Sequence, residues 1–458
     1  MRTYLEQEPI CALATAPGQG ALAVIRVSGK GAIALVASHF QGKDLRTAPS
    51  HTAHFGRILD AQGRTIDTVV VTLFRAPRSY TGEDVVEISA HGGWLVSRLI
   101  LETLMEAGCR PAEPGEFTRR AFLNGKLDLA QAEAVADLIQ ASSRWAHQVS
   151  IAHLEGKLSE RLRGFRDRLL HLVAMLELEL DFAEEDVEFA DRAELLALLE
   201  SLMAELEALV SSFALGQVIR EGVVTAIAGR PNAGKSTLLN QLVGRDRAIV
   251  SEIPGTTRDL IEEQLQLDGL LFRLFDTAGI RETGDVIEEE GVRRTLRILQ
   301  EAHLLLYVYD ATVGWTEEEK RFLEAYRLRH PEKAVLVLAN KVDRLPPGYT
   351  LSDATHLPIS AQTGWGLDRL RQAMRECVIG AGVPPEASGV ITNARHHAAL
   401  RRALEALNQA QEAFRAGRSS DLLVVPLKAA LHELGTITGE VTTEDVLAYI
   451  FARFCIGK

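Results

Sequence analysis

One short segment of the chain combines glycine, lysine and serine at a spacing suited to binding phosphate. Residues 223–242 read VVTAIAGRPNAGKSTLLNQL, an apolar strand, a glycine-rich turn and a helix. Gly229–Ser236 fits GxxxxGK[ST], the P-loop pattern, in the strand–loop–helix context that the pattern requires. Free N–H groups at the helix start favour negative charge, Lys235 adds a point charge, and the Ser236 hydroxyl can ligate Mg²⁺. The phosphate contacts predicted from this match are Asn232, Ala233, Gly234, Lys235, Ser236 and Thr237.

Two motifs further along the chain have the positions of switch segments. The run TTRD at 256–259 stands in an unpatterned stretch, where a threonine hydroxyl can complete the Mg²⁺ shell and sense a γ-phosphate. The run LLFRLFDTAG at 270–279 is a strand ending in D-x-x-G, so Asp276 can hold a Mg²⁺-bound water and the Gly279 N–H can reach the γ-phosphate. The nucleotide contacts predicted in these segments are Thr256, Thr257, Asp276, Thr277, Ala278 and Gly279.

The next motif selects the base. In Asn340-Lys341-Val342-Asp343 the Asp343 carboxylate offers two acceptors to the N1–H and exocyclic amine of guanine, whereas adenine would leave the charge unpaired. A later Ser360-Ala361 can present a backbone N–H to the guanine oxygen. The predicted base contacts are Asn340, Lys341, Asp343, Ser360 and Ala361. Motifs of this kind in this order predict a GTP-hydrolysing domain over residues 217–379.

The residue after D-x-x-G is Ile280, where many small GTPases have a glutamine that positions the attacking water. An apolar side chain cannot orient water, so an acid or amide must come from elsewhere in the chain or from a partner. The segment 281–292 offers several carboxylates, most of which we interpret as a solvated face.

Composition limits the wider possibilities. A chain of 458 residues with 47% apolar and 24% charged residues predicts a soluble protein of two or three domains. No continuous apolar run or secretion signal is evident, and the four cysteines have no metal-site spacing, which favours a reducing cytosol. With 50 basic and 62 acidic residues the net charge is −12. Because RNA binding depends on lysine and arginine side chains that neutralise phosphates, RNA would have to bind to a local basic patch or to a partner protein.

Three patterns follow one another along the chain. Residues 9–114 alternate short strands with turns around one helical run at 95–106, which predicts an α+β module. Two helical blocks flank the nucleotide motifs, and Asp191 with Glu194 resembles a capping box at the start of a second helix. The acidic link 181–188 is most simply a solvated turn. After the nucleotide motifs, helices are expected from Asn393 to before Gly417 and from Thr443 to near Phe454. The stripe that predicts the first long helix is Leu154, Leu158, Leu162, Phe165, Leu169, Leu172, Leu176 and Leu180.

These residues together resemble the MnmE (TrmE) family of tRNA modification GTPases, within the TrmE-Era-like P-loop GTPases. The nucleotide motifs GRPNAGKSTLLN, GTTRD, DTAGIRET and NKVD would also fit several translation-related GTPases. More specific are TGEDVVE at 81–87, PGEFTRRAFLNGKLDLAQAEA at 114–134 and the terminal CIGK at 455–458. The similarity therefore runs over essentially the whole chain.

The resemblance implies a multidomain α/β and all-α chain. Its parts would be an N-terminal α+β tetrahydrofolate-binding and dimerisation domain (1–120), a helical domain in two parts (121–216 and 380–458) and an inserted Ras-like G domain with a doubly wound sheet (217–379). It further implies a cytoplasmic homodimer that works with a FAD-containing MnmG-type partner in a heterotetramer-like complex, meets tRNA mainly through that partner and binds no membrane. Such proteins place a carboxymethylaminomethyl or aminomethyl group on the wobble uridine, with the one-carbon unit taken from 5-formyl-tetrahydrofolate or a related folate.

The same resemblance assigns site residues. It implies K⁺ held by Asn232, the carbonyls of Ser251 and Ile253, and the Thr256 side chain, and Mg²⁺ held by Ser236 and Thr257. It places the catalytic glutamate at Glu288. Apart from the resemblance, Cys455 is a candidate catalytic thiol near the pterin or a plain packed residue. Pro254 departs from the residue common in the K⁺ loop, but it leaves the flanking carbonyls available. The implied folate contacts are Arg26, Glu87, Lys126 and Lys458.

Other interpretations of the motifs are weaker. GQGALA at 18–23 matches a dinucleotide fingerprint, but strand-like residues follow it, so we interpret it as a turn near the folate pocket. CIGK lacks the aliphatic residue of a prenylation box. The main alternative function is a ribosome-assembly GTPase switch, which predicts a basic RNA-binding module such as a KH domain. A dynamin-like GTPase would instead predict a membrane-binding element.

Overall fold

The computed structural model describes residues 8–181, 192–246, 262–276, 296–346, 351, 353–379 and 389–458. It divides into two compact units. The first contains Met1–Ile139, His153–Ala190 and Glu412–Lys458, and the second contains Gln140–Ala152 and Asp191–Gln411. Both units therefore combine segments that are far apart in the sequence. The four domain ranges given above stay a prediction.

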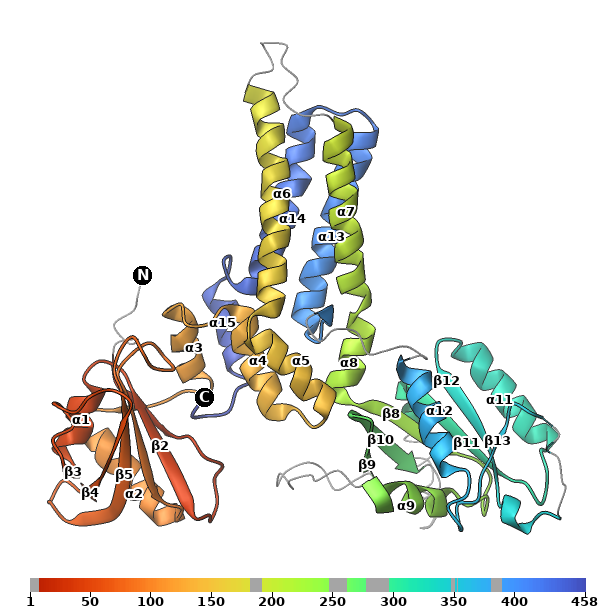
Figure 1. Cartoon of the computed structure of the whole chain (residues 1–458), viewed down its shortest axis with the longest axis horizontal. Helices are drawn as coiled ribbons and strands as arrows, with labels where there is room; N and C mark the ends of the chain where they lie inside the picture. The colour runs from red at the N-terminus through yellow and green to blue at the C-terminus, as the bar shows by residue number, and fades with distance from the viewer. Residues whose placement is uncertain are drawn as a thin grey trace. The chain divides into compact units, whose positions relative to one another are not determined.

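A seven-stranded sheet forms the amino-terminal part of the first unit, in the order β3-β4-β5-β6-β2-β1-β7. Its neighbours are antiparallel except for β1 and β7, which run parallel. Helices α1 (Ala32–Ser38) and α2 (Trp94–Glu106) pack on this sheet over an apolar core (Figure 1). The strands are β1 (Ile10–Leu13), β2 (Leu22–Ser28), β3 (Phe40–Gln41), β4 (Thr52–Leu59), β5 (Thr65–Phe74), β6 (Val85–His91) and β7 (Arg110–Pro111).

Helices complete the first unit. The long α6 packs along α14, the ion pair Lys428–Glu177 joins the two helices, and Arg166 of α6 pairs with Glu440 just after α14. A separate apolar cluster joins α4 to α15 and to Phe454 beyond it, so α15 and the residues after it are anchored against α4. The helices are α3 (Glu116–Leu123), α4 (Leu129–Gln140), α6 (Lys157–Asp181), α14 (Ser420–Thr438) and α15 (Glu444–Phe451).

The second unit is built around a six-stranded sheet in the order β13-β12-β11-β8-β10-β9. All neighbours are parallel except β9, an antiparallel edge strand. One face packs against α9 and α12 and the other against α11 and helical residues 296–301, so helices cover both faces. The strands are β8 (Val223–Ala228), β9 (Glu262–Leu267), β10 (Leu270–Asp276), β11 (Leu304–Asp310), β12 (Ala334–Asn340) and β13 (Leu357–Pro358).

The remaining elements of this unit surround the sheet. Helix α5 belongs to it although it precedes the sheet by many residues, because Ala146 and Val149 are buried in the same apolar core as α9 and β10. The segment before α8, which leads into the sheet, is joined to the segment before α13, which follows it. The Ile391 N–H donates to Ser212 Oγ at 3.0 Å. The helices are α5 (Arg144–Leu154), α7 (Arg192–Ser211), α8 (Phe213–Glu221), α9 (Lys235–Asp246), α11 (Glu317–Arg329), the short η2 (Val342–Arg344), α12 (Leu367–Ile379) and α13 (Ala394–Arg415).

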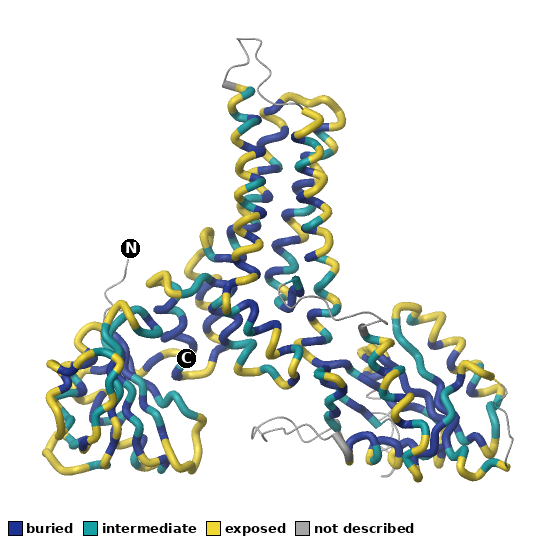
Figure 2. The backbone as a smooth tube through the Cα atoms, in the orientation of Figure 1, coloured by how far each residue is buried: buried dark blue, intermediate teal, exposed yellow. Residues whose placement is uncertain are grey.

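The α+β module, the helical blocks and the G domain with helices on both faces of its sheet confirm the expected fold class. The leucine stripe is largely buried along α6, as Figure 2 shows for one side of each long helix. Two details were wrong. Leu154 ends α5 instead of joining the long helix, because residues 155–156 form a turn, and α15 stops at Phe451.

One part of the described chain, Arg192–Glu221, is long enough and, over a window of 18 residues, apolar enough to span a membrane by length and composition alone. It is not a continuous apolar run, because charged residues such as Glu194, Glu200 and Glu207 interrupt it. The segment is the pair α7 and α8, and its leucines at steps of three and four are buried, which is the pattern of a core helix.

Candidate functional site

The predicted phosphate loop lies at the carboxyl edge of the second unit's sheet. Strand β8 is buried and leads directly into the loop, and α9 begins at Lys235, so the strand–loop–helix prediction is confirmed. The Lys235 side chain is 5% exposed, and its ammonium donates to the carbonyls of Gly229 at 2.9 Å and Arg230 at 2.8 Å. Thr237 lies in the first turn of α9. The sheet order reverses around β8, where ligands bind in doubly wound folds.

A hydroxyl and a carboxylate meet beside this loop. Ser236 Oγ donates to Asp276 Oδ2 at 2.7 Å. The two residues are close because β8 and β10 are parallel neighbours whose carboxyl ends coincide, with Asp276 opposite Ile227. Hydroxyl and carboxylate oxygens are the ligands that Mg²⁺ prefers, so this pair fits a metal ion at the phosphates.

Asn340 joins the base-recognition motif to two other loops. Its side chain is 2% exposed, donates through Nδ2 to the Ala233 carbonyl at 2.8 Å and accepts from the Ala361 N–H through Oδ1 at 2.9 Å. The phosphate loop, the NKVD turn and the Ser360-Ala361 turn are thus held together by one amide. Three loops that are far apart in the sequence form one site, as the motif order predicted.

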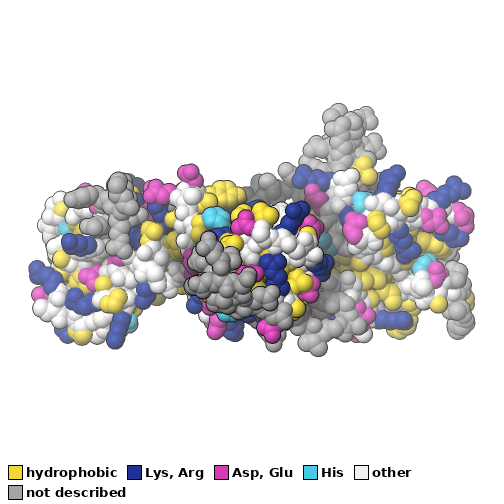
Figure 3. Space-filling view, turned by 90° about the horizontal axis from the view of Figure 1, so that it is seen from above, with side chains coloured by type: hydrophobic (Ala, Val, Ile, Leu, Met, Phe, Trp, Pro, Cys, Tyr) yellow, Lys and Arg dark blue, Asp and Glu magenta, His cyan; other side chains and the backbone are white. Residues whose placement is uncertain are grey.

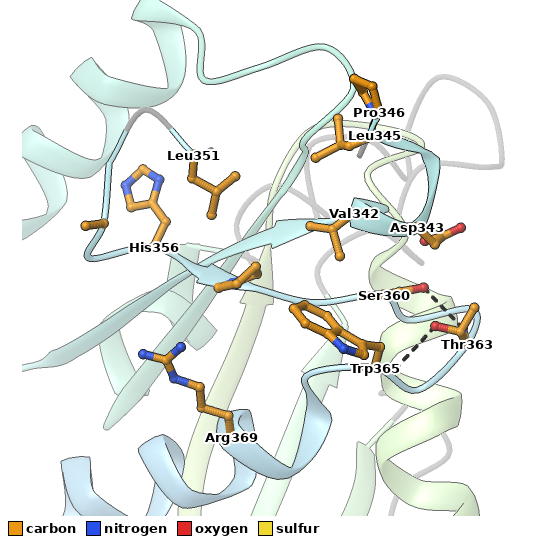
Figure 4. Close-up of a pocket in the computed structure, with 12 residues that line it drawn as sticks. Val342, Asp343, Leu345, Pro346, Leu351, His356, Ser360, Thr363, Trp365 and Arg369 are labelled. Carbon is orange, nitrogen blue, oxygen red and sulfur yellow. Dashed lines mark hydrogen bonds between the residues drawn. The ribbon is translucent and has the colours of Figure 1, made fainter. Parts of the chain in front are cut away.

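A cavity of about 640 Å³ borders the base-recognition turns (Figure 4). Its wall includes Asp343 and Ser360, whose polar ends lie on one side, away from Leu351 and His356 on the other (Figure 4). Ser360 Oγ accepts from the Thr363 N–H at 3.2 Å, which fixes the turn. Most of the lining residues are apolar, and none of them belongs to the phosphate loop at 229–236.

The first unit holds a second charged group. Arg26 on β2 and Glu87 on β6 stand opposite each other in register, with Arg26 Nε donating to Glu87 Oε1 at 2.9 Å. Strand alternation turns both away from the core that Ile25 and Val27 enter. The guanidinium lies 5.6 Å from the ring centroids of Tyr80 and Phe117.

The carboxyl-terminal tail closes this group. Arg26 Nη1 donates to the Gly457 carbonyl at 3.1 Å. Burial and the nearby Arg26 guanidinium lower the pKa of the Lys458 ammonium, against the attraction of Glu87. Cys455 is exposed in the same tail. The structure therefore brings Arg26, Glu87 and the tail together, whereas the exposed Lys126 is engaged elsewhere, with its ammonium donating to the Pro77 carbonyl at 3.1 Å.

Comparison with known proteins gives matches along nearly the whole chain. Residues 9–126 match the model of the GTP-binding protein TrmE N-terminus, and residues 129–455 match the MnmE helical domain. A tRNA modification GTPase MnmE of Salinibacter ruber is 52% identical over 463 residues, covering 99% of this chain and 100% of that protein. The chain belongs to the MnmE family of tRNA modification GTPases. It is a GTP hydrolase.

Two further proteins similar to this chain are a curated relative and a solved structure. The tRNA modification GTPase MnmE of Chlorobium phaeobacteroides is 48% identical over 464 residues, covering 98% of this chain and 97% of that protein. A crystal structure of an Era variant from Aquifex aeolicus bound to GDP and AlF₄⁻ is 31% identical, covering 40% of this chain and 65% of that one, with a TM-score of 0.27.

Several site residues implied by the family lie outside the described residues. These are Ser251, Ile253, Thr256, Thr257, Thr277, Ala278, Gly279 and Glu288, together with Pro254 and Ile280. Their roles stay predictions.

Sequence reasoning missed a buried ionic network beside Arg26. Arg120, 3% exposed, donates to Glu83 Oε2 at 3.1 Å and to Glu116 Oε1 at 3.0 Å, and Ser28 Oγ donates to Glu83 Oε2 at 2.8 Å. Burial opposes ionisation of Glu116, but the guanidinium groups of Arg110 and Arg120 lower the pKa of this carboxyl. The available signal was the acidic and basic residues in TGEDVVE at 81–87 and PGEFTRR at 114–120.

Proposed function

We propose that the chain is a K⁺-stimulated GTPase that acts with a FAD-containing MnmG-type partner to place a carboxymethylaminomethyl or aminomethyl group on the wobble uridine of tRNA. The one-carbon unit comes from 5-formyl-tetrahydrofolate or a related folate. The observation that carries this proposal is the charged group of Arg26, Glu87 and the tail, which accompanies the guanine-nucleotide loops in a member of this family. A GTPase that only switches between nucleotide states needs no such second site.

The chemistry of folate suits the Arg26 group. A folate has a pterin with a donor edge at one end and glutamate carboxylates at the other. Glu87 can accept from the pterin, while Arg26 and Lys458 supply positive charge, and the half-buried Tyr80 ring gives an apolar wall. We assign Lys126 to the glutamate carboxylates, which requires it to leave the Pro77 carbonyl, and Cys455 to a thiol near the pterin.

At the nucleotide site, we assign Mg²⁺ to Ser236 and Thr257, with Asp276 acting through water. K⁺ is assigned to Asn232, the carbonyls of Ser251 and Ile253, and the Thr256 side chain. A cation at the phosphates supplies positive charge where negative charge develops during hydrolysis. Glu288 is assigned to orient the attacking water in the absence of a glutamine after D-x-x-G. Hydrolysis is expected to be fastest when two G domains meet across K⁺.

The assembly follows from the same assignment. We propose a cytoplasmic homodimer formed through the N-terminal domain and a heterotetramer-like complex with the flavoprotein. The net charge is −12, and acidic and basic side chains are interspersed on the face seen in Figure 3. Because phosphate binding depends on clustered lysine and arginine, this surface favours contact with tRNA mainly through the partner.

Wobble nucleosides from a strain lacking this chain test the proposal. Mass spectrometry should show loss of the modified uridine, restoration by the wild-type chain and no restoration by Lys235→Ala, whose phosphate loop lacks its charge. Affinity purification of the wild-type chain should also recover a FAD-containing protein. An unchanged nucleoside profile together with accumulation of ribosomal subunit precursors would instead support a ribosome-assembly GTPase.

A further inference from the structure

One ammonium joins three loops of the nucleotide site. Lys341 Nζ donates to the Asn232 carbonyl at 2.6 Å and to Asp310 Oδ2 at 2.6 Å. Asp310 ends β11 and Asn340 ends β12, and the two are opposite each other in register. Lys341 is the residue directly after the end of β12, beside Asp310 at the end of β11. Its side chain is therefore within reach of the Asp310 carboxylate.

The Asp310 carboxylate is also held by Thr312, independently of the lysine. Its Oδ1 accepts from the Thr312 N–H at 2.9 Å and from Thr312 Oγ1 at 2.6 Å, which leaves Oδ2 for Lys341. The side chains of Lys341 and Asp310 are 22% and 20% exposed, so water screens the pair only in part. Partial burial opposes the charge, but bonds from Lys341 and Thr312 lower the pKa of the Asp310 carboxyl, so it is ionised at neutral pH.

The other end of this chain of contacts is a backbone in an uncommon conformation. Asn232 has φ of 61° and Lys341 has φ of 67°, both left-handed values that side chains other than glycine adopt at a cost. The Lys341 ammonium donates a hydrogen bond to the Asn232 carbonyl. The next carbonyl along the loop, that of Ala233, accepts a hydrogen bond from the Asn340 side chain. A lysine side chain loses rotamer entropy when it becomes ordered. If the Asp310 carboxylate already orients Lys341 in the free protein, less of this entropy is lost when the nucleotide binds.

We propose that Asp310 is a positioning residue for guanine-nucleotide binding. It holds Lys341 on the Asn232 carbonyl and so keeps the base-recognition turn and the phosphate loop in register with each other before the nucleotide arrives. Asn232 is also the side chain proposed to hold K⁺. A second consequence, which rests on the proposed function, is that Asp310 sets how tightly that K⁺ is bound.

The chain offers a matched control for Asp310. Asp353 makes the same turn, since its Oδ1 accepts from the Thr355 N–H at 2.8 Å and from Thr355 Oγ1 at 2.7 Å, but its Oδ2 is paired with His356 at 3.5 Å instead of a lysine. Asn in either position retains the Oδ1 acceptor. Asp310→Asn places an amide donor against the Lys341 ammonium, whereas Asp353→Asn leaves the nucleotide loops unchanged.

Titration of fluorescent GDP and GTP analogues into the full chain measures the expected effect. Asp310→Asn should weaken both nucleotides by about 5- to 30-fold and raise KM for GTP similarly, while kcat at saturation stays within about threefold of wild type, because a charge-assisted contact is lost without loss of any group that touches the reacting atoms. Asp353→Asn should bind as wild type. Equal affinities for Asp310→Asn and wild type, or equal losses in both variants, would overturn the proposal.

Two further arms separate positioning from general destabilisation. In a Lys341→Gln background, Asp310→Asn should cause no additional loss of affinity, since its effect passes through that ammonium; additive losses would contradict this. The K⁺ concentration for half-maximal hydrolysis should rise in Asp310→Asn. If the wild type shows no K⁺ dependence, the K⁺ assignment fails, and the affinity measurements still decide the role of Asp310.

Discussion

Replacing Gly457 by alanine isolates the contribution of the carboxyl-terminal tail to the proposed folate site. Gly457 has φ of 97°, and an added Cβ would lie 2.4 Å from the Leu13 carbonyl oxygen and 3.0 Å from Ala14 Cα. Both neighbours are backbone atoms, so no side chain can move to relieve the clash. The tail must therefore leave its place on the end of β1, and the Arg26 bond to the Gly457 carbonyl is lost with it.

The two consequences differ in size. The left-handed backbone alone costs alanine about 1–3 kcal/mol, more than enough to release a short tail. Little is lost from the free energy of unfolding, because Cys455 and Ile456 are exposed while Phe454 remains in the α4–α15 cluster. The folate site loses the Lys458 charge and the alignment of Arg26. A charge-assisted contact contributes about 1.5–3 kcal/mol, so folate affinity should fall by about 10- to 150-fold.

Calorimetric titration of 5-formyl-tetrahydrofolate into the full chain measures this directly. Gly417→Ala is the control, because Gly417 also has a positive φ, 63°, but an added Cβ there would have nothing within 4 Å. A chain ending at Phe454 should reproduce the loss seen with Gly457→Ala. Wild-type affinity in Gly457→Ala, or the same loss in Gly417→Ala, would refute the assignment of the tail to the folate site.

Four other outcomes follow from the nucleotide site. Asp343→Asn should shift preference from GTP toward xanthosine triphosphate at a cost of about 1.5–3 kcal/mol in GTP binding, measured by nucleotide titration. Turnover should be high in K⁺ and low in Na⁺, and equal rates in the two salts would remove the cation from the mechanism. Glu288→Ala should lower kcat by roughly 10²–10⁴-fold with nucleotide affinity retained, while Glu290→Ala stays near wild type; equal losses would indicate only a solvated face. Asn340→Ala leaves the buried Ala361 N–H unpaired and should destabilise the chain by about 2–4 kcal/mol in urea unfolding; a change below about 1 kcal/mol would contradict the bridging role.

The G domain could be predicted from the sequence because its motifs sit at strand ends. Parallel strands bring their carboxyl ends to one edge of a sheet, so a lysine, a serine and an asparagine from separate motifs had to meet. The helix starting after Asn393 was predicted for a similar local reason, since the Asn393 side chain accepts from the Arg395 N–H at 2.9 Å.

Other features depend on contacts that no local pattern reveals. Helix α14 was not predicted, and Pro426 lies inside it, where proline usually argues against a helix. In the sequence, Asp310 is an ordinary polar residue at the end of a strand. Its proposed role follows from the ion pair with Lys341, which only the structure shows. The pairing of Arg26 with Glu87 required the strand register, and the contact with Gly457 joins residues at opposite ends of the chain.

We propose that this GTPase transfers a one-carbon unit from folate to tRNA together with a flavoprotein partner. The most direct test supplies the full chain, the partner, GTP, K⁺ and unmodified tRNA with a tetrahydrofolate carrying carbon-13 in its one-carbon unit. Mass spectrometry of the wobble nucleoside should then show the label in the added group, and its loss when GTP is omitted. A modified but unlabelled uridine, or labelling that is independent of this chain, would contradict the proposed function.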